Sequence, residues 1–184
     1  MREMTDHQLM LAVRDGDLDK LGYLFEKYHK QLYNYLLRQL VDPQSSEDIV
    51  QEVFLKMLKY RHTYRGEGQF RTWMYSIAHN ARIDHLKRAS RYVTTEEIDR
   101  LLSAGPTPEE SFEQSSRHDV LYEALSRLSD DKREVLVLSR FQNLKYEEIS
   151  RILGCPVGTI KARVFHALND LRRFLNKYGG EVTR

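Results

Sequence analysis

The sequence predicts an all-α fold made of two small helical domains. Apolar residues recur at helical spacing along most of the chain, and no segment shows the alternation of a strand. Glycine (nine) and proline (four) are scarce, which also favours helices. A hydrophobic fraction of 41% is sufficient for packed cores, and 184 residues suit one or two small domains.

Two helices are predicted at the N-terminus. The first covers residues 5–13, with Thr5 or Asp6 as its N-cap. The second begins with Asp17 or Asp19 as its cap and then carries leucine and aromatic residues at helical spacing.

A proline separates the second helix from the third. Asp42 precedes Pro43, and the residue before proline avoids the α conformation. Ser45 or Ser46 is then expected to cap a helix that continues to Tyr60.

A fourth helix is predicted over residues 70–89, after a loop at Arg65-Gly66-Glu67-Gly68. Trp73 and Ile77 lie four residues apart, so we expect Trp73 to lie in the core. Phe70 is also assigned to the core.

The two domains are expected over residues 1–91 and 119–184. The segment between them, 92–118, contains Gly105-Pro106-Thr107-Pro108 and is interpreted as a mobile linker. It has six acidic and two basic residues and is therefore acidic. The preceding segment, 56–91, has nine basic and two acidic residues, so a basic module is followed by an acidic connector.

The segment from Tyr146 to Leu168 has the pattern of a helix-turn-helix. Gly154 can adopt a positive φ and end the first helix, and Pro156 sets φ for the start of the second. Inward-facing residues are expected at Ile149, Ile152, Leu153, Ile160 and Val164, with Lys161, Arg163, Phe165 and His166 on another face. This face suits DNA, although an αα-hairpin with a solvated basic face is the alternative.

Several functional classes are disfavoured by the sequence. The single cysteine, Cys155, forms no thiolate cluster and is expected to be a small buried residue. No pair of histidines has zincin spacing, and no phosphate-binding glycine loop is present, so we expect no metal, no cofactor and no enzyme. The N-terminus is not a signal peptide and no apolar run is long enough to span a membrane, so a cytoplasmic protein is expected.

Three motifs in order resemble the extracytoplasmic-function (ECF) group of bacterial RNA polymerase sigma factors. EDIVQEVFLKML resembles the core-binding segment, and FRTWMYSIAHNARIDHLKR resembles the segment that melts and reads the −10 element. LSDDKREVLVLSRFQNLKYEEISRILGCPVGTIKARVFHAL resembles the region that reads the −35 element. The resemblance implies a transcription initiation factor that binds core RNA polymerase and promoter DNA, with an anti-sigma factor as a further partner.

The resemblance also implies how each segment acts. Asp48, Gln51, Glu52 and Leu55 share one helix face and are expected to bind the clamp helices of the polymerase β′ subunit, while the second domain meets the β flap. Separated DNA strands need cations along the backbone and pockets for unstacked bases. The residues expected to bind the −10 element are Tyr64, Tyr75, His79, Asn80, Arg82, Lys87, Arg88 and Arg91, with Tyr64 as the stacking group for a flipped base.

The recognition helix departs from the family pattern. Its expected DNA-binding residues are Thr159, Lys161, Ala162, Arg163, Phe165 and His166. The family usually has arginine where this chain has His166 and Leu168, and often serine where it has Ala162. Lys161 and Arg163 are therefore expected to be the main cationic contacts, with Phe165 available for a thymine methyl group.

Two other functions fit parts of the sequence. A dimeric regulator of the LuxR type has similar C-terminal helices, but the all-helical, basic segment 70–91 disfavours its N-terminal domain. An anti-sigma factor or other polymerase-binding adaptor has no need for a recognition helix.

Overall fold

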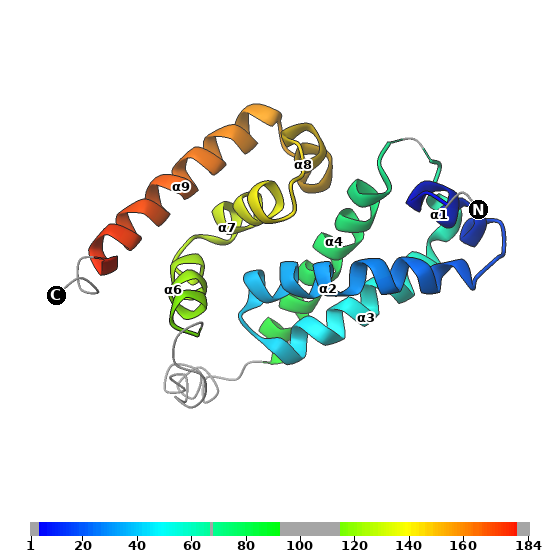
Figure 1. The fold of residues 1–184 in the computed structure, drawn as a ribbon, viewed down its shortest axis with the longest axis horizontal. Helices are drawn as coiled ribbons and strands as arrows, with labels where there is room; N and C mark the ends of the chain where they lie inside the picture. The colour runs from blue at the N-terminus through cyan, green and yellow to red at the C-terminus, as the bar shows by residue number, and fades with distance from the viewer. Residues whose placement is uncertain (1–3, 67, 93–114, 180–184) are drawn as a thin grey trace.

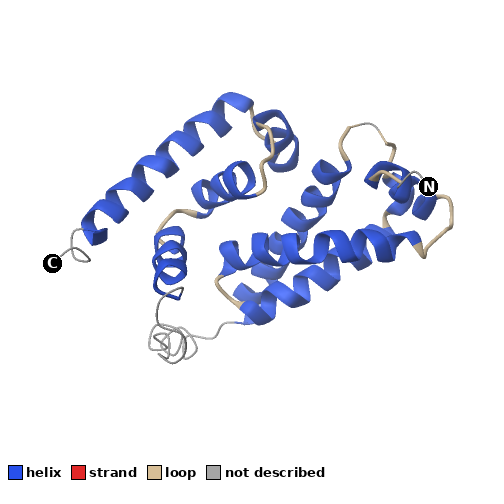
Figure 2. Ribbon diagram, in the orientation of Figure 1, coloured by secondary structure: helices blue, strands red, loops and turns tan. Residues whose placement is uncertain are grey.

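The protein is all-helical wherever the computed structural model describes it, which is for residues 4–66, 68–92 and 115–179. No strand occurs within these ranges (Figure 2). The N-terminal helices form one half of the molecule, and the C-terminal helices pack beside α2 and α4, with α9 outermost (Figure 1). The all-α prediction is therefore confirmed.

The N-terminal half consists of four α-helices and one 3₁₀ turn. The second and third helices pack against each other, as do the third and fourth. In chain order the elements are α1 (Asp6–Arg14), α2 (Lys20–Leu40), α3 (Pro43–Lys59), η1 (Arg61–Thr63) and α4 (Phe70–Tyr92).

The cap predicted for α1 is present. Thr5 Oγ1 accepts a hydrogen bond from the Gln8 N–H at 3.3 Å, and Gln8 Oε1 accepts one from the Thr5 N–H at 2.9 Å. This reciprocal pair satisfies two N–H groups that the first helical turn leaves without partners. Asp19 is the N-cap residue of α2, but its side chain makes no capping hydrogen bond.

The start predicted for α3 is wrong. The helix begins at Pro43, and its N-cap is Asp42, whose side chain accepts a hydrogen bond from the Gln44 N–H at 3.1 Å. Proline suits the first helical position because its fixed φ is helical and the missing N–H has no partner there. Ser46 does not cap the helix; it is buried and its hydroxyl donates to the Asp42 carbonyl at 2.6 Å.

The C-terminal half consists of α6 (Ser115–Ser126), α7 (Asp130–Leu136), η2 (Val137–Phe141), α8 (Tyr146–Leu153) and α9 (Val157–Gly179). Helix α6 begins within the segment expected to be linker. Residues 93–114 lie outside the described part of the chain, so the predicted mobile tether is untested.

The helix-turn-helix of α8 and α9 has the predicted geometry. Gly154 ends α8 in the left-handed region with φ of 64°. Of the residues predicted to face inward, Ile149, Ile152, Ile160 and Val164 are buried, and Leu153 is half-buried against the core. Cys155 is only half-buried, and its carbonyl accepts a hydrogen bond from the Ser150 hydroxyl at 2.6 Å.

Helix α7 continues into the wider π-helical turn η2. The Gln142 N–H donates to the carbonyl of Val137, five residues earlier, at 3.0 Å. Such turns contain one residue more than the α-helix would, and they often lie next to functional positions.

The two halves share one hydrophobic core. Leu32, Leu36 and Met74 from the N-terminal half belong to the same buried cluster as Leu138 and Ile149 from the C-terminal half. A second, smaller cluster packs α6, α7 and α9 together through Leu125, Leu128, Leu136 and Ala167. The expectation of two helical units did not include this extensive packing between them.

No helix in the described part of the chain is long and apolar enough to cross a membrane.

We expect Gly154→Ala to lower the free energy of unfolding by about 1 kcal/mol, because a side chain disfavours the left-handed backbone there. No atom lies within 4 Å of a Cβ placed at this position, so the cost is conformational and not steric. Gly158→Ala is the matched control, since Gly158 lies in a helix with equal space around it. Urea unfolding followed by circular dichroism should show loss of stability for the first variant only.

Candidate binding surfaces

The predicted core-binding face lies on α3. Asp48 and Gln51 are exposed, and Leu55 is 67% exposed, the largest exposed fraction among the large hydrophobic residues that the structure describes. Three of the four predicted residues are therefore accessible to a partner. A leucine held in water beside a carboxylate is a suitable anchor for a partner that has an apolar groove and basic flanks.

Glu52, the fourth residue of this face, is engaged within the chain. Its carboxylate lies 2.9 Å from Lys56 Nζ and 2.8 Å from an Arg88 nitrogen. Partial burial opposes ionisation, but these hydrogen bonds outweigh it and lower the pKa of Glu52. Glu52 therefore ties α3 to the end of α4 and is less available to a partner than Asp48.

Three residues predicted to bind the −10 element, Tyr75, His79 and Arg82, contact the C-terminal half. Tyr75 is fully buried, and its hydroxyl donates to Gln142 Oε1 at 2.6 Å. Arg82 is also fully buried and donates to Asp130 at 3.0 Å and to Glu134 at 2.7 Å.

Glu134 on α7 is the central acceptor of this interface. Tyr35 and His79 donate to its Oε1 at 2.7 and 2.8 Å, and Arg82 donates to its Oε2. Burial opposes ionisation of Glu134, but its hydrogen bond from His79 and the Arg82 charge lower its pKa. Burial and the charge of Glu134 hold the pKa of Tyr35 well above its ordinary value, so that hydroxyl remains a donor.

Further polar contacts extend the interface along α4 and to the end of α2. The Thr72 hydroxyl donates to Glu148 Oε1 at 3.0 Å, and Glu148 Oε2 accepts from the backbone N–H of Lys145 at the start of α8. Arg133 donates to the backbone carbonyl of Gln39 at 2.6 Å.

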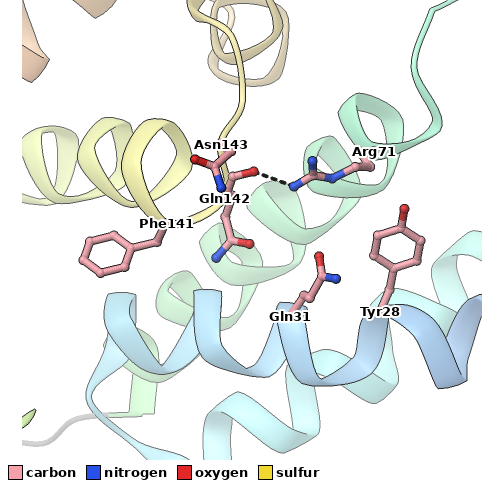
Figure 3. A pocket seen from close by; sticks show the side chains of 6 residues that line it. All are labelled: Tyr28, Gln31, Arg71, Phe141, Gln142 and Asn143. Carbon is pink, nitrogen blue, oxygen red and sulfur yellow. Dashed lines mark hydrogen bonds between the residues drawn. The ribbon is translucent and has the colours of Figure 1, made fainter.

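A polar crevice of about 360 Å³ lies at one edge of this interface. Arg71 reaches from α4 to the carbonyl of Gln142, and the side chains of α2 rise on the other side (Figure 3). Its lining residues are Tyr28, Gln31, Arg71, Phe141, Gln142 and Asn143. The crevice exists only because the two halves are in contact.

Three of the other α4 residues predicted to bind the −10 element, Asn80, Lys87 and Arg88, lie outside this interface. Asn80 and Lys87 are exposed, and Arg88 is exposed but paired with Glu52. Arg91 belongs to α4, but its side chain lies outside the described structure.

Tyr64, predicted to stack on a flipped base, lies in an aromatic cluster. It is 3% exposed, with ring centroids 5.1 Å from Trp73 and 6.2 Å from Phe70. The Tyr64 hydroxyl is 3.0 Å from His7 Nδ1, and burial raises the pKa of Tyr64. Phe70 is buried and Trp73 is half-buried against the core, so both core assignments are confirmed.

The recognition helix α9 has one buried and one exposed face. Ile160, Val164 and Ala167 are buried, whereas the opposite face is open to solvent. Phe165 is 62% exposed, and its ring centroid lies 5.6 Å from that of His166. The accessible predicted residues are Lys161, Ala162, Phe165 and His166, while Thr159 is half-buried.

Arg163, predicted from the helix-turn-helix pattern to be a main cationic contact with DNA, is less accessible than that role requires. It is half-buried, and its guanidinium lies 2.7 Å from a carboxylate oxygen of Asp131 on α7. Lys161 is therefore the more accessible of the two expected cations.

The sequence interpretation missed Asp130, Glu134, Gln142 and Glu148. The only available signal was the spacing of Asp130 and Glu134, which lie on one helix face at i and i+4. That spacing does not identify a partner in the other half of the chain. Within the described ranges, no group of three histidine, cysteine or acidic side chains is arranged to hold a metal ion.

Comparison with known proteins finds two family regions in the chain. Residues 24–92 match Sigma-70 region 2, and residues 118–171 match Sigma-70, region 4. The RNA polymerase sigma-H factor of Pseudomonas aeruginosa is 31% identical, with 95% of this chain and 96% of that protein covered. The ECF RNA polymerase sigma-E factor of Haemophilus influenzae is 30% identical, with 90% and 92% covered.

A solved structure has a similar fold. The sigma factor RpoE in complex with the anti-sigma factor NepR from Bartonella quintana matches with a TM-score of 0.67 and 23% identity. The match covers 84% of this chain and 96% of that one.

The two matched regions and the helix-turn-helix define a promoter-directing transcription factor. The chain belongs to the sigma-70 family of RNA polymerase sigma factors, in its ECF group. Its function is to direct RNA polymerase to promoters at transcription initiation.

Proposed function

We propose that this sigma factor divides its work between a region 2 domain over residues 1–91 and a region 4 domain over residues 119–184. The observation that carries the proposal is the face of α9, where Lys161, Phe165 and His166 are exposed opposite a fully buried face. A helix with this asymmetry can enter the major groove without unfolding its own domain. The protein acts in the cytoplasm, where polymerase and chromosomal DNA are found.

The region 2 domain binds core polymerase through Asp48, Gln51 and Leu55. Leu55 supplies apolar area, and Asp48 supplies a negative charge that matches a basic coiled coil such as the β′ clamp helices. Glu52 contributes by fixing α3 against α4 through Lys56 and Arg88. The region 4 domain docks on the β flap of the polymerase. This docking sets the distance between region 2 and region 4 on the promoter.

Strand separation at the −10 element uses the residues of α4. The exposed Asn80 can offer an amide to the edge of an unpaired base, and Lys87 can neutralise a backbone phosphate. Tyr64 is inside the aromatic cluster in this conformation, so a stacking role for it requires the loop before α4 to move.

The −35 element is read by α9. Lys161 contacts a phosphate or a guanine edge, and Phe165 contacts a thymine methyl group. Arg163 has to leave Asp131 before it can contact DNA. An anti-sigma factor is the regulatory partner that we propose, and the RpoE complex is a precedent for a sigma factor of similar fold bound in this way.

Asp48→Lys should weaken capture of core polymerase at least tenfold, because like charges placed at an interface cost several kcal/mol. The exposed position of Asp48 means that the folded structure should be retained. A pull-down with core polymerase at moderate salt measures the effect. Asp19→Lys, the same charge change at an exposed residue outside this face, should bind core normally; equal binding by both variants would disprove the face.

Asn80→Ala should impair open-complex formation more than closed-complex binding, because the proposed partner of Asn80 is an unpaired base. Permanganate footprinting on duplex promoter DNA should show less strand opening, and a pre-melted template should restore the complex. If the pre-melted template restores nothing and duplex binding is reduced equally, Asn80 does not contact a base.

His166→Arg should tighten −35 binding and steepen its salt dependence by about one unit of slope, because an arginine on a phosphate displaces a counterion. Phe165→Ala is the contrasting variant, since loss of an apolar contact should weaken binding without changing the slope. Fluorescence anisotropy with a −35 duplex at several salt concentrations measures both. An unchanged affinity and slope for His166→Arg would place this side chain away from DNA.

A further inference from the structure

Helix α1 lies outside residues 24–92, which match Sigma-70 region 2, yet it packs against η1 and α4 beside the loop that joins them (Figure 1). We propose that His7 on this helix is a positioning residue of the −10-reading site, which holds the loop before α4 through the Tyr64 hydroxyl. This role rests on the −10 function of region 2 proposed above. It makes Tyr64 the anchor of the loop, in place of the stacking role predicted from the sequence.

Helix α1 is itself fixed against the rest of the domain. Val13 is fully buried in the shared core. At the start of the helix, Asp6 accepts hydrogen bonds of 2.6 Å from the Tyr28 hydroxyl and from Lys27 Nζ, both on α2. His7 follows Asp6 directly, so its backbone is held at a fixed distance from α2. It is therefore a firm point to which a loop can be attached.

The loop contacts α1 at three points. His7 Nδ1 lies 3.0 Å from the Tyr64 hydroxyl, and the two rings meet edge to face with centroids 5.8 Å apart. About two helical turns further along α1, Arg14 donates to the backbone carbonyl of Tyr64 at 3.5 Å. The third contact is at Gly66, where a Cβ would lie 2.5 Å from His7 Cε1. The loop can pass this close to the imidazole only because Gly66 has no side chain.

The position of Tyr64 suits an anchor and not a stacking group. Its ring packs against Phe70 and Trp73, and only 3% of the residue is exposed, so a base cannot reach the ring face. A tyrosine with a buried ring needs a polar partner for its hydroxyl, and His7 provides that partner. The hydroxyl therefore fastens the loop to α1, which a phenylalanine at this position would not do.

The anchor determines where the exposed residues of the loop lie. His62 and Arg65 flank Tyr64 and are exposed, so they can offer an imidazole and a guanidinium to a DNA strand. A shift of the loop would move both groups relative to Asn80, which is exposed on α4. Hydrogen bonds weaken steeply as their distance and angle depart from the optimum. Loss of the anchor should therefore lower the discrimination between bases.

The test compares variants of the full chain assembled with core polymerase. Tyr64→Phe removes only the hydroxyl and keeps the aromatic ring, His7→Leu removes the ring nitrogens, and a third variant combines both changes. His29→Leu is the matched control, because His29 Nδ1 lies 2.8 Å from the Phe25 carbonyl within α2. Anisotropy measures binding of a labelled single strand with the −10 element of a promoter that the holoenzyme transcribes, and of the same strand substituted at each position in turn. Urea unfolding measures the stability of each variant.

Tyr64→Phe and His7→Leu should each reduce the affinity ratio between the original and a substituted strand about fivefold, the factor that one net hydrogen bond contributes. The double variant should match the single variants, because both changes act through the same hydrogen bond. His7→Asn keeps a polar nitrogen near the place of Nδ1 and should retain most of the wild-type ratio. His29→Leu should retain all of it.

An unchanged ratio in Tyr64→Phe would overturn the anchor and favour stacking, because a phenylalanine ring stacks as well as a tyrosine ring. Loss of stability with no change in the ratio would also overturn it, since His7 would then serve the fold alone.

A failure of the −10 role itself is recognised by Asn80→Ala in the same assay. If Asn80→Ala weakens strand binding while the His7 and Tyr64 variants behave as the wild type, α1 has no part in reading and the −10 surface stands. If every variant, Asn80→Ala included, leaves affinity and ratio unchanged, the −10 surface is wrongly assigned.

Discussion

The structure depends on one buried carboxylate. Glu134 is the group on which Tyr35 from α2 and His79 and Arg82 from α4 converge. It carries the charge that makes burial of the Arg82 guanidinium tolerable in the shared core. Without it, the apolar residues of α7 could still pack, but the buried Arg82 would keep only the half-exposed Asp130 as a carboxylate partner.

Helix α4 therefore has two packed faces. Met74, Ala78 and Ala81 are buried with no polar side-chain atoms to satisfy, whereas the buried Tyr75 and Arg82 make their polar contacts with region 4. The same helix builds the core of region 2 and supplies the surface on which region 4 rests. This dual use explains why residues with DNA-binding chemistry are enclosed in a protein whose function is to bind DNA.

The elements that sequence predicts correctly are those set by local chemistry. The Thr5 cap, the left-handed Gly154 and the inward phase of Ile160 and Val164 follow from neighbouring residues alone. The start of α3 is also set locally, but Asp42 and Pro43 form its cap and first turn rather than the break that their pattern predicts.

The environment of Arg82 and Tyr75 could not be predicted, because their partners lie more than 45 residues away and leave no periodic signal. Tyr64 is a similar case. Its pattern marks an aromatic residue in a loop, but only the folded chain brings His7 and Trp73 against it.

The π-helical turn η2 determines the orientation of the helix-turn-helix formed by α8 and α9. One residue of an α-helix corresponds to a rotation of about 100°, so the extra residue between Val137 and Gln142 fixes the direction in which the chain leaves α7. An insertion or deletion here would rotate α8 and α9 as a unit and would separate Gln142 from Tyr75. Divergence of promoter specificity in such a chain can therefore proceed by substitution on α9, while the length of this turn is constrained by the contact with α4.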